Sequence, residues 1–262
     1  MIESGQQTLV TDAVKDRTAL LPSTDEQRGS TNLQGSAAAD GQQLPAMPTT
    51  LHALLSKLDL HSADTTIARP AGVVLELTLR YLSELHQSQT SVEQPILAAA
   101  HRHALLERAY ANLIDGLPAQ LRHQAQHFME AQMEEEQDVV HGALWARNIV
   151  VSAIRTDEIS VAEGELYWGD GTYDLACIAS DYAVPLVRSG GPLEPLSNLI
   201  WYRYRGLRRG QRCGTERSFR VHLALQLMRK TLGFESTPGP LNRGDVIRGR
   251  VLYTNELIRW LR

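Results

Sequence analysis

The spacing of apolar residues predicts α-helices over most of the chain beyond residue 50. In the range 71–86, apolar positions recur near the helical period and charged residues occupy positions between them. These apolar positions are Val74, Leu77, Tyr81 and Leu85. Further helices are expected at 51–60, 96–115 and 118–136, with a connection through Pro70 after the first and a break at Gly116-Leu117-Pro118 before the last.

The pattern changes near residue 138 and becomes helical again near residue 173. Short strands around turns are expected at Val139–His141, Asn148–Ser152 and Glu158–Glu163. The core-facing positions of two later helices are expected to be Val221, Leu225, Met228 and Leu232, and then Ile247, Val251, Ile258 and Leu261. The expected fold class is therefore α+β, a mainly helical domain with a small β insert at its middle.

Composition separates the first 50 residues from the rest. Every aromatic residue lies at or beyond Tyr81, and residues 1–50 are rich in Gln, Ser, Thr, Ala and Gly. A segment of this kind cannot bury enough apolar surface to offset the entropy lost on ordering. We therefore expect a disordered low-complexity tail at 1–50, a short helix with a connection at 51–69, and the folded lobe at 70–262. A partner-binding role for the tail is a second interpretation.

The net charge of -4 and the two cysteines argue against several classes of protein. Bulk nucleic-acid binding uses a strongly basic face, so nucleic acid is not the expected partner, although a local RNA site stays open. Cys177 and Cys213 supply neither a disulfide framework nor a cysteine-rich zinc site. A signal-peptide pattern and an apolar run of roughly 18 residues are both absent from the sequence. A cytoplasmic protein without a membrane partner is expected.

The segment Val139–Val151 carries the most specific motif of the chain. It contains His141, Gly142 and Asn148 between two apolar runs, and Ala143 follows the glycine. The segment resembles the catalytic loop of the aminoglycoside phosphotransferase and choline kinase families, which have a protein-kinase-like fold. Their loop reads His-Gly-Asp, four variable residues and Asn. Ala143 therefore stands at the position of the family's aspartate.

Two further segments carry the same resemblance. Gly169–Ala176 is similar to the Gly-Asp-Pro-x-x-Asp-Leu-Ala block of these families, with Gly171 in place of proline. Leu82–His86 is similar to the end of the helix that opens their large lobe. The families place a metal-binding aspartate upstream of the block, and counting back without gaps puts Ala162 there. The resemblance covers about residues 70–262 and implies the C-terminal lobe of a kinase-like phosphotransferase, without a recognisable N-terminal lobe.

The departures from the family pattern bear on catalysis. In kinase-like phosphoryl transfer, the loop aspartate accepts or orients the substrate's hydroxyl proton, while the asparagine and the second aspartate hold Mg²⁺. A methyl group at Ala143 or Ala162 does neither. The resemblance also implies that Asp174 braces the backbone of the loop and that His141 is a structural hydrogen-bonding residue. The bracing residues are thus kept while the reacting ones are missing.

Other residues offer only weak replacements for the missing groups. The families hold the α/β-phosphates with a strand lysine, whereas Lys57, the candidate nearby, lies in a pattern typical of a surface helix. Glu163 and Glu165 flank the lost metal position, and a one-residue slip of the strand would bring Glu163 into it. Asn148 has two interpretations, a weak metal or nucleotide ligand and a structural residue of the loop.

An arginine-rich segment offers a candidate binding surface. Arginines recur between Trp201 and Arg220, beside three aromatic residues. Guanidinium groups bind phosphate and carboxylate in a bidentate manner and stack on aromatic rings. This pattern indicates a site for an anionic ligand or an acidic partner, and a solvated helical face is the alternative. The candidate residues are Arg203, Arg205, Arg208, Arg209 and Arg212.

Two remaining clusters have structural interpretations. The acidic residues Glu134, Glu135, Glu136 and Asp138 are expected at the exposed end of a helix. The histidine pairs are His101 with His103, and His123 with His127. The second pair has the i,i+4 spacing of a metal site, but a third ligand is not visible nearby, so surface histidines are expected rather than a metal centre.

The sequence therefore favours a non-catalytic, pseudokinase-like protein of the phosphotransferase fold. It would act by binding a protein partner or a small anionic ligand, as a regulatory or assembly partner, and would need no cofactor. The alternative is a divergent small-molecule phosphotransferase that uses ATP and Mg²⁺ with non-standard acidic residues. Its substrate would be a hydroxylated metabolite or antibiotic. Metal-dependent nucleotide binding separates the two hypotheses.

Overall fold

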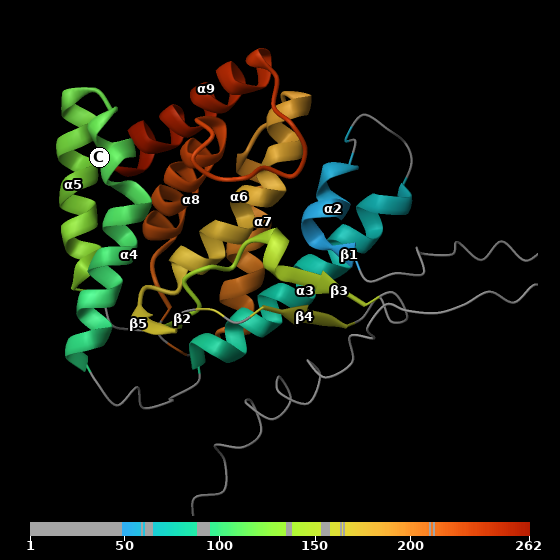
Figure 1. Ribbon diagram of the computed structural model, residues 1–262, viewed down its shortest axis with the longest axis horizontal. Helices are drawn as coiled ribbons and strands as arrows, with labels where there is room; N and C mark the ends of the chain where they lie inside the picture. Colours follow the sequence, from blue (N-terminus) through green and yellow to red (C-terminus); the bar gives the residue numbers. More distant parts are fainter. Residues whose placement is uncertain are drawn as a thin grey trace, which may run out of the picture. The chain divides into compact units, whose positions relative to one another are not determined.

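Helices and short strands make up most of the chain in the computed structural model (Figure 1). The described residues are 49–58, 60, 65–87, 95–134, 138–152, 158–162, 164, 166–209, 211 and 213–262, with backbone alone at 65–67 and 95–101. They belong to one unit, Pro45–Arg262. The expected tail at 1–50 lies outside the described residues, except for Thr49 and Thr50, which form a strand.

The described fold is α+β, which confirms the expected class. The α-helices are α2 (Leu51–Ser56), α3 (Thr65–Gln87), α4 (Pro95–Asp115), α5 (Ala119–Met133), α6 (Thr172–Ser189), α7 (Glu194–Leu207), α8 (Glu216–Thr231) and α9 (Arg243–Trp260). The strands are β1 (Thr49–Thr50), β2 (Asp138–Val140), β3 (Ile149–Val151), β4 (Ile159–Val161) and β5 (Tyr167–Gly169), and a 3-10 helix, η1, spans Ala146–Asn148.

The described strands form two small antiparallel sheets. Strand β3 is central in the first sheet, with Thr50 of β1 opposite Val150 and Val161 of β4 opposite Ile149. Strands β2 and β5 form the second sheet. Two connections run between these sheets, the loop 141–148 from β2 to β3 and the segment 162–166 from β4 to β5. The pairing of the strands therefore brings these two connections close together.

The segment before α3 packs onto the rest of the fold. The Thr50 hydroxyl accepts a hydrogen bond from the Ala53 backbone N–H, 3.2 Å away, and so caps the start of α2. Leu51 and Leu55 of α2 are completely buried. At the other end of α2, the Arg188 guanidinium donates to the backbone carbonyls of Leu55 and Ser56. Strand β1 and helix α2 are therefore integral parts of the described fold.

The expected connection through Pro70 is wrong, because α3 begins at Thr65 and contains Pro70. Proline in a helix interior removes one backbone hydrogen bond and usually marks an end. Pro70 lies within the first turns of a long amphipathic helix, and burial of Ala71, Val74 and Leu75 stabilises the helix directly after it. Tertiary packing therefore extends the helix past a local signal for a break.

Helices α6, α8 and α9 form the packed centre of the described fold. Figure 1 shows α6 between α8 and α7, with α9 lying across α8. Most side chains of α6 are buried, including Leu175, Ile178 and Val184. Val221, Leu225 and Met228 of α8 are buried as expected, whereas Leu232 follows the helix and is exposed. The centre therefore consists of α6 and α8, which are buried around most of their circumference, with α9 packed against them.

The expected core face of α9 is wrong. Ile247, Val251 and Ile258 are 58%, 54% and 37% exposed, although Leu261 is buried. The face toward α8 instead contains Gly249, where an added Cβ would lie 2.2 Å from the Thr231 side chain. Close approach of α8 and α9 requires a residue without a side chain at this point. The apolar spacing identified a real face of α9 but assigned it to the wrong side.

Candidate functional site

Asp174, at the start of α6, binds the backbone of the loop 141–148. Its carboxylate accepts hydrogen bonds from the backbone N–H of His141, at 2.5 Å, and of Gly142, at 2.9 Å. Asp174 is completely buried. Gly142 has a φ of 77°, a left-handed conformation that glycine adopts without a steric penalty. The aspartate, the helix start and the glycine together hold the loop in one conformation.

Two more side chains extend this buried network toward α7. The His86 Nε2 atom lies 3.4 Å from the Asp174 carboxylate, and the His86 Nδ1 atom lies 2.6 Å from the Tyr204 hydroxyl. Since the carboxylate only accepts, Nε2 carries a proton, and Nδ1 shares a hydrogen bond with the Tyr204 hydroxyl. His86 ends the α3 segment that resembles the family, so three family-like segments contribute to this network.

The loop histidine links the two connections between the sheets. The His141 Nε2 atom donates to the Ala162 carbonyl oxygen, 2.9 Å away, and its Nδ1 atom accepts from the Ala143 backbone N–H at 3.3 Å. The Ala162 backbone N–H also donates to the Asn148 carbonyl oxygen at 2.8 Å. The positions 141, 143, 148 and 162, singled out from sequence, therefore lie together.

The groups at this place have little capacity for proton or metal chemistry. Ala143 and Ala162 offer only methyl groups. The Asn148 side-chain N–H donates to the Ala143 carbonyl oxygen, 2.8 Å away, so the side-chain oxygen is the atom of this amide that could bind a metal. Asp174 is occupied by backbone N–H groups. The alternative metal residues Glu163 and Glu165 lie outside the described residues.

The part of the chain that the structure describes contains no cluster of three or more His, Cys, Asp or Glu residues arranged to hold a metal ion. His123 and His127 contact each other edge to face on the exposed side of α5, with ring centres 4.7 Å apart. His127 also lies 3.4 Å from the Glu130 carboxylate. His103 is exposed, and the His101 side chain lies outside the described residues.

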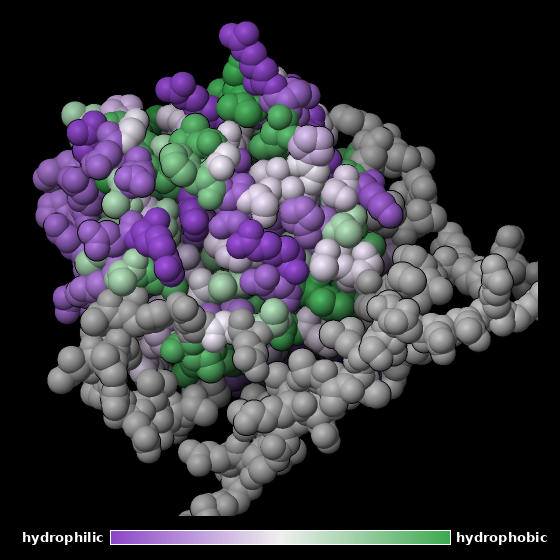
Figure 2. All heavy atoms as spheres, in the orientation of Figure 1, coloured by the Kyte–Doolittle hydropathy of each residue, from purple (hydrophilic) through white to green (hydrophobic). Residues whose placement is uncertain are grey.

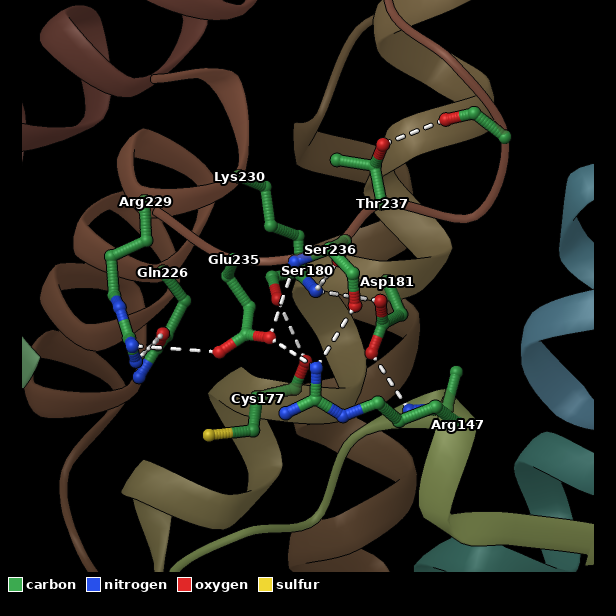
Figure 3. A network of polar contacts seen from close by, with 12 residues as sticks. Arg147, Cys177, Ser180, Asp181, Gln226, Arg229, Lys230, Glu235, Ser236 and Thr237 are labelled. Atoms are coloured by element: carbon green, nitrogen blue, oxygen red, sulfur yellow. Dashed lines mark hydrogen bonds and ion pairs between the residues drawn. The ribbon is translucent and has the colours of Figure 1, made fainter. Parts of the chain in front are cut away.

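A second aspartate of α6 holds the far end of the loop (Figure 3). The Asp181 carboxylate accepts from the Ala146 backbone N–H at 2.9 Å and from the Lys230 ammonium at 2.7 Å. The same ammonium lies 4.8 Å from the centre of the Trp145 ring, within cation–π distance. Asp181 follows Asp174 by seven residues, so both carboxylates lie on one face of α6. This heptad spacing is the sequence signal that points to Asp181.

Arg147 ties the loop to the turn that follows α8. Its guanidinium donates to the Glu235 carboxylate at 2.6 Å and to the Ser236 hydroxyl at 3.0 Å. Glu235 also forms an ion pair with Arg229 at 3.5 Å (Figure 3). The Lys230 ammonium donates to the Ser236 carbonyl oxygen at 3.2 Å. The loop is therefore attached to α6, α8 and the turn after α8 at once.

The arginine-rich segment divides into exposed and buried residues. Arg203, Arg205 and Arg209 are exposed on and just after α7, as an anion-binding surface requires, whereas Arg212 lies outside the described residues. Arg208 is only 4% exposed and forms an ion pair with the Asp138 carboxylate at 2.6 Å. The expectation that Arg208 binds a ligand from solution is therefore wrong, because the fold itself uses this guanidinium.

The position of Asp138 contradicts the expectation that this residue lies at the exposed end of a helix. It is completely buried at the start of β2 and not at an exposed helix end, whereas Glu134 is exposed and Glu135 and Glu136 lie outside the described residues. Burial raises the pKa of the Asp138 carboxyl, and the charge of Arg208 acts against this rise. Gly171 donates its backbone N–H to Asp138 at 3.3 Å, a bond that the family's proline could not make.

Arg220 is also a structural residue. Its guanidinium is 2% exposed and donates to the Ser197 hydroxyl, the Asn198 side chain and the Glu216 carboxylate. It stacks over the Trp260 ring, with its central carbon 5.5 Å from the ring centre. Among the described arginines of this basic segment, Arg208 and Arg220 are thus buried in internal ion pairs, whereas Arg203, Arg205, Arg209 and Arg217 are exposed.

Comparison with known proteins adds no family assignment. No protein-family model matches the chain, and no curated protein matches it. Within the described residues, the helices are all too short or too polar to cross a lipid bilayer.

Proposed function

We propose that the chain is a non-catalytic, pseudokinase-like protein whose described fold corresponds to the C-terminal lobe of a phosphotransferase. It acts by binding and not by phosphoryl transfer. The observation that carries the proposal is the joint position of Ala143 and Ala162 beside His141, in a loop that Asp174 holds by its backbone. The contacts of these residues support equivalence with the family's loop, and both reactive positions carry methyl groups.

The energetic argument concerns the two missing carboxylates. Removing a positioned general base typically lowers the rate by about 10²–10⁴-fold. Mg²⁺ is a hard cation that prefers carboxylate and water oxygens, and Asn148 alone is a poor site for it. The Asn148 N–H donates to the Ala143 carbonyl oxygen, which leaves one neutral amide oxygen where the family has an asparagine and an aspartate. A loop with these side chains provides neither the proton acceptor nor the principal metal ligand of the family reaction.

The residues before α3 support the same conclusion. A phosphate-binding lysine would be expected on a strand of a nucleotide-binding lobe. In the described part of that region, β1 adds to the edge of β3, and α2 packs against η1 and α6. Lys57 is exposed at the C-terminal cap of α2. The described residues here contribute to the helical lobe itself.

A role in binding explains why the loop remains so strongly held. Asp174 and Asp181 hold its two ends, and Arg147 fixes its outer side to Glu235. The buried hydrogen bonds to the Asp174 and Asp181 carboxylates each contribute about 1.5–3 kcal/mol, whereas the Arg147–Glu235 contact is exposed and contributes less. Strong retention of loop shape with loss of the reacting groups fits a surface that a regulatory or assembly partner recognises.

The test measures nucleotide binding and turnover together. Thermal unfolding is followed with ATP alone and with ATP and Mg²⁺, and the same protein is assayed for phosphorylation of small hydroxylated compounds. We expect no metal-dependent rise in Tm and no product. Metal-dependent stabilisation with turnover that disappears in Asn148→Ala would contradict the proposal and favour the divergent phosphotransferase. Gln126→Ala, at an exposed position of α5, is the matched control.

A further inference from the structure

The outer face of α9 exposes a stripe of aliphatic side chains. Ile247, Val251 and Ile258 are all substantially exposed, and at 3.6 residues per turn they lie within about 40° of one another around the helix axis. They lie opposite Gly249, the residue that faces α8. Figure 2 shows hydrophobic side chains gathered over α9 among hydrophilic ones. An exposed apolar stripe on a surface helix typically marks an interaction site.

Positive charge lies on both sides of this stripe. Arg243 and Arg250 lie along one side, and Arg248 and Arg259 along the other, and all four are exposed. The two acidic residues of α9, Asp245 and Glu256, are buried on its inner side. Among the described residues, Arg243 and Arg250 have no ion-pair partner. Arg248 and Arg259 are already paired with Asp245 and Glu194. The outer face is therefore apolar along its centre, and the positive charge along the edge that carries Arg243 and Arg250 is unpaired within the described part of the chain.

A groove of the opposite character lies between α4 and α5. It encloses about 220 Å³. Its floor is formed by Leu106, Ile114 and Met129, which are nearly buried, and by the half-buried Met133. Its edges carry the exposed carboxylates of Glu107, Asp115 and Glu130. Glu107 and Asp115 form no ion pair within the described residues. The groove is thus apolar at its centre and acidic at its rim.

The size of the groove favours a side chain over a small molecule. Sites for small molecules usually enclose about 300–1,000 Å³, and this groove is smaller. Helix-in-groove recognition uses aliphatic anchors at i and i+4, such as Ile247 and Val251 on α9, inserted between two neighbouring helices. The arginines beside the anchors would then meet the rim carboxylates, and such electrostatic complementarity favours this pairing over others.

We propose that the outer face of α9 docks into the α4–α5 groove of a second copy of this chain. The two surfaces are different, so the contact is heterologous: each copy presents one helix face and one groove. Association then proceeds head to tail, and closes into a ring or continues as an open chain. The interface rests on surfaces away from the loop 141–148, so it is independent of the proposed loss of catalysis.

The experiment is sedimentation velocity of the full chain over a range of protein concentrations, at low and at high salt. We expect the average mass to rise with concentration and to fall with salt, because exposed ion pairs are screened. Val251→Glu in the helix face and Ala111→Arg in the groove are each expected to weaken self-association by roughly tenfold or more. Leu199→Glu on α7 and Asn112→Arg beside the groove are the matched exposed controls.

Mixing the two defective variants gives the decisive result. Val251→Glu retains an intact groove and Ala111→Arg retains an intact helix face, so an equal mixture is expected to form a one-to-one complex. Circular dichroism of each variant checks that it is folded. A wild-type protein that stays monomeric, or a mixture that fails to associate, would overturn the proposal. Monomeric protein that binds phosphatidylserine vesicles through Val251 would assign the face to a membrane surface instead.

Discussion

The buried Asp138–Arg208 pair allows a quantitative test of the structure. Asp138 is completely buried, Arg208 is 4% exposed, and their charged atoms lie 2.6 Å apart. Arg208→Met removes the positive charge with little change in shape and leaves the carboxylate inside the protein. Breaking one partner of a buried ion pair typically costs about 3–5 kcal/mol. We expect the free energy of unfolding of Arg208→Met to fall by this amount near neutral pH.

The pH dependence of this variant has a defined sign. Burial already raises the pKa of the Asp138 carboxyl, and Arg208 opposes that rise. Without Arg208 the folded-state pKa rises further, so the folded state binds the proton more readily than the unfolded state does. Stability then increases as the pH falls toward the ordinary value of an aspartate. The deficit of Arg208→Met is therefore expected to shrink between about pH 7.5 and pH 5.

Urea denaturation, followed by tryptophan fluorescence at both pH values, measures these changes. The double variant Asp138→Asn/Arg208→Met carries no charge at either of these two buried positions, and it keeps an acceptor for the Gly171 N–H. We expect it to recover about 2 kcal/mol relative to Arg208→Met at neutral pH, without the pH effect. Arg209→Met, at the exposed neighbour, should change stability by less than about 0.5 kcal/mol. A cost of Arg208→Met below about 1 kcal/mol would refute the buried geometry, since that is typical of a surface pair.

Three other changes test other parts of the fold. Burial lowers the pKa of His222 to about 3, so acid is expected to destabilise the protein below about pH 6.5 by up to 1.4 kcal/mol per pH unit. In urea titrations, His222→Gln should lessen this dependence of stability on pH, whereas the exposed control His123→Gln should not. Asp174→Ala should lower stability by about 3 kcal/mol or more and speed hydrogen exchange of the Gly142 amide. Leu55→Ala should cost about 2–5 kcal/mol, measured as a lower Tm.

For each of these three variants, one result would contradict the prediction. An unchanged acid slope in His222→Gln would mean that the imidazole is not buried in its neutral form between Tyr110 and Gln132. An unaltered hydrogen-exchange rate of the Gly142 amide in Asp174→Ala would show that the aspartate does not hold the loop. A Leu55→Ala variant as stable as wild type would show that α2 does not pack on the fold as described.

The sequence predicted the long helices because their apolar positions repeat over several turns. The contact of Asp174 with the loop, which the resemblance implied, is present although the two segments are 33 residues apart. The sequence missed β5, Tyr167–Gly169, because this segment lacks the run of β-branched residues found in β3. Its assignment of the α9 face failed because spacing identifies an apolar side without identifying what covers it.

Long-range ion pairs were beyond the reach of sequence patterns. Asp138 and Arg208 are 70 residues apart, and each belonged to a run of like charges that reads as exposed surface. Burial of both partners depends on how β2 and the end of α7 meet, which the tertiary fold decides. Arg220 is likewise buried although it belongs to a run of like charges. A charged residue within a cluster therefore gives little information about its own exposure until its partner is known.

The two aspartates of α6 hold the loop 141–148 at two points, and the helix between them sets the distance between these points. Asp174 and Asp181 are seven residues apart, which separates them by about 10.5 Å along the helix and about 20° around it. One binds the backbone at 141 and 142, and the other binds it at 146. Insertion or deletion of one residue between them would turn the second carboxylate by about 100° and release one end of the loop. Changes of chain length are therefore forbidden in this stretch of α6, whereas substitutions that preserve its packing are not.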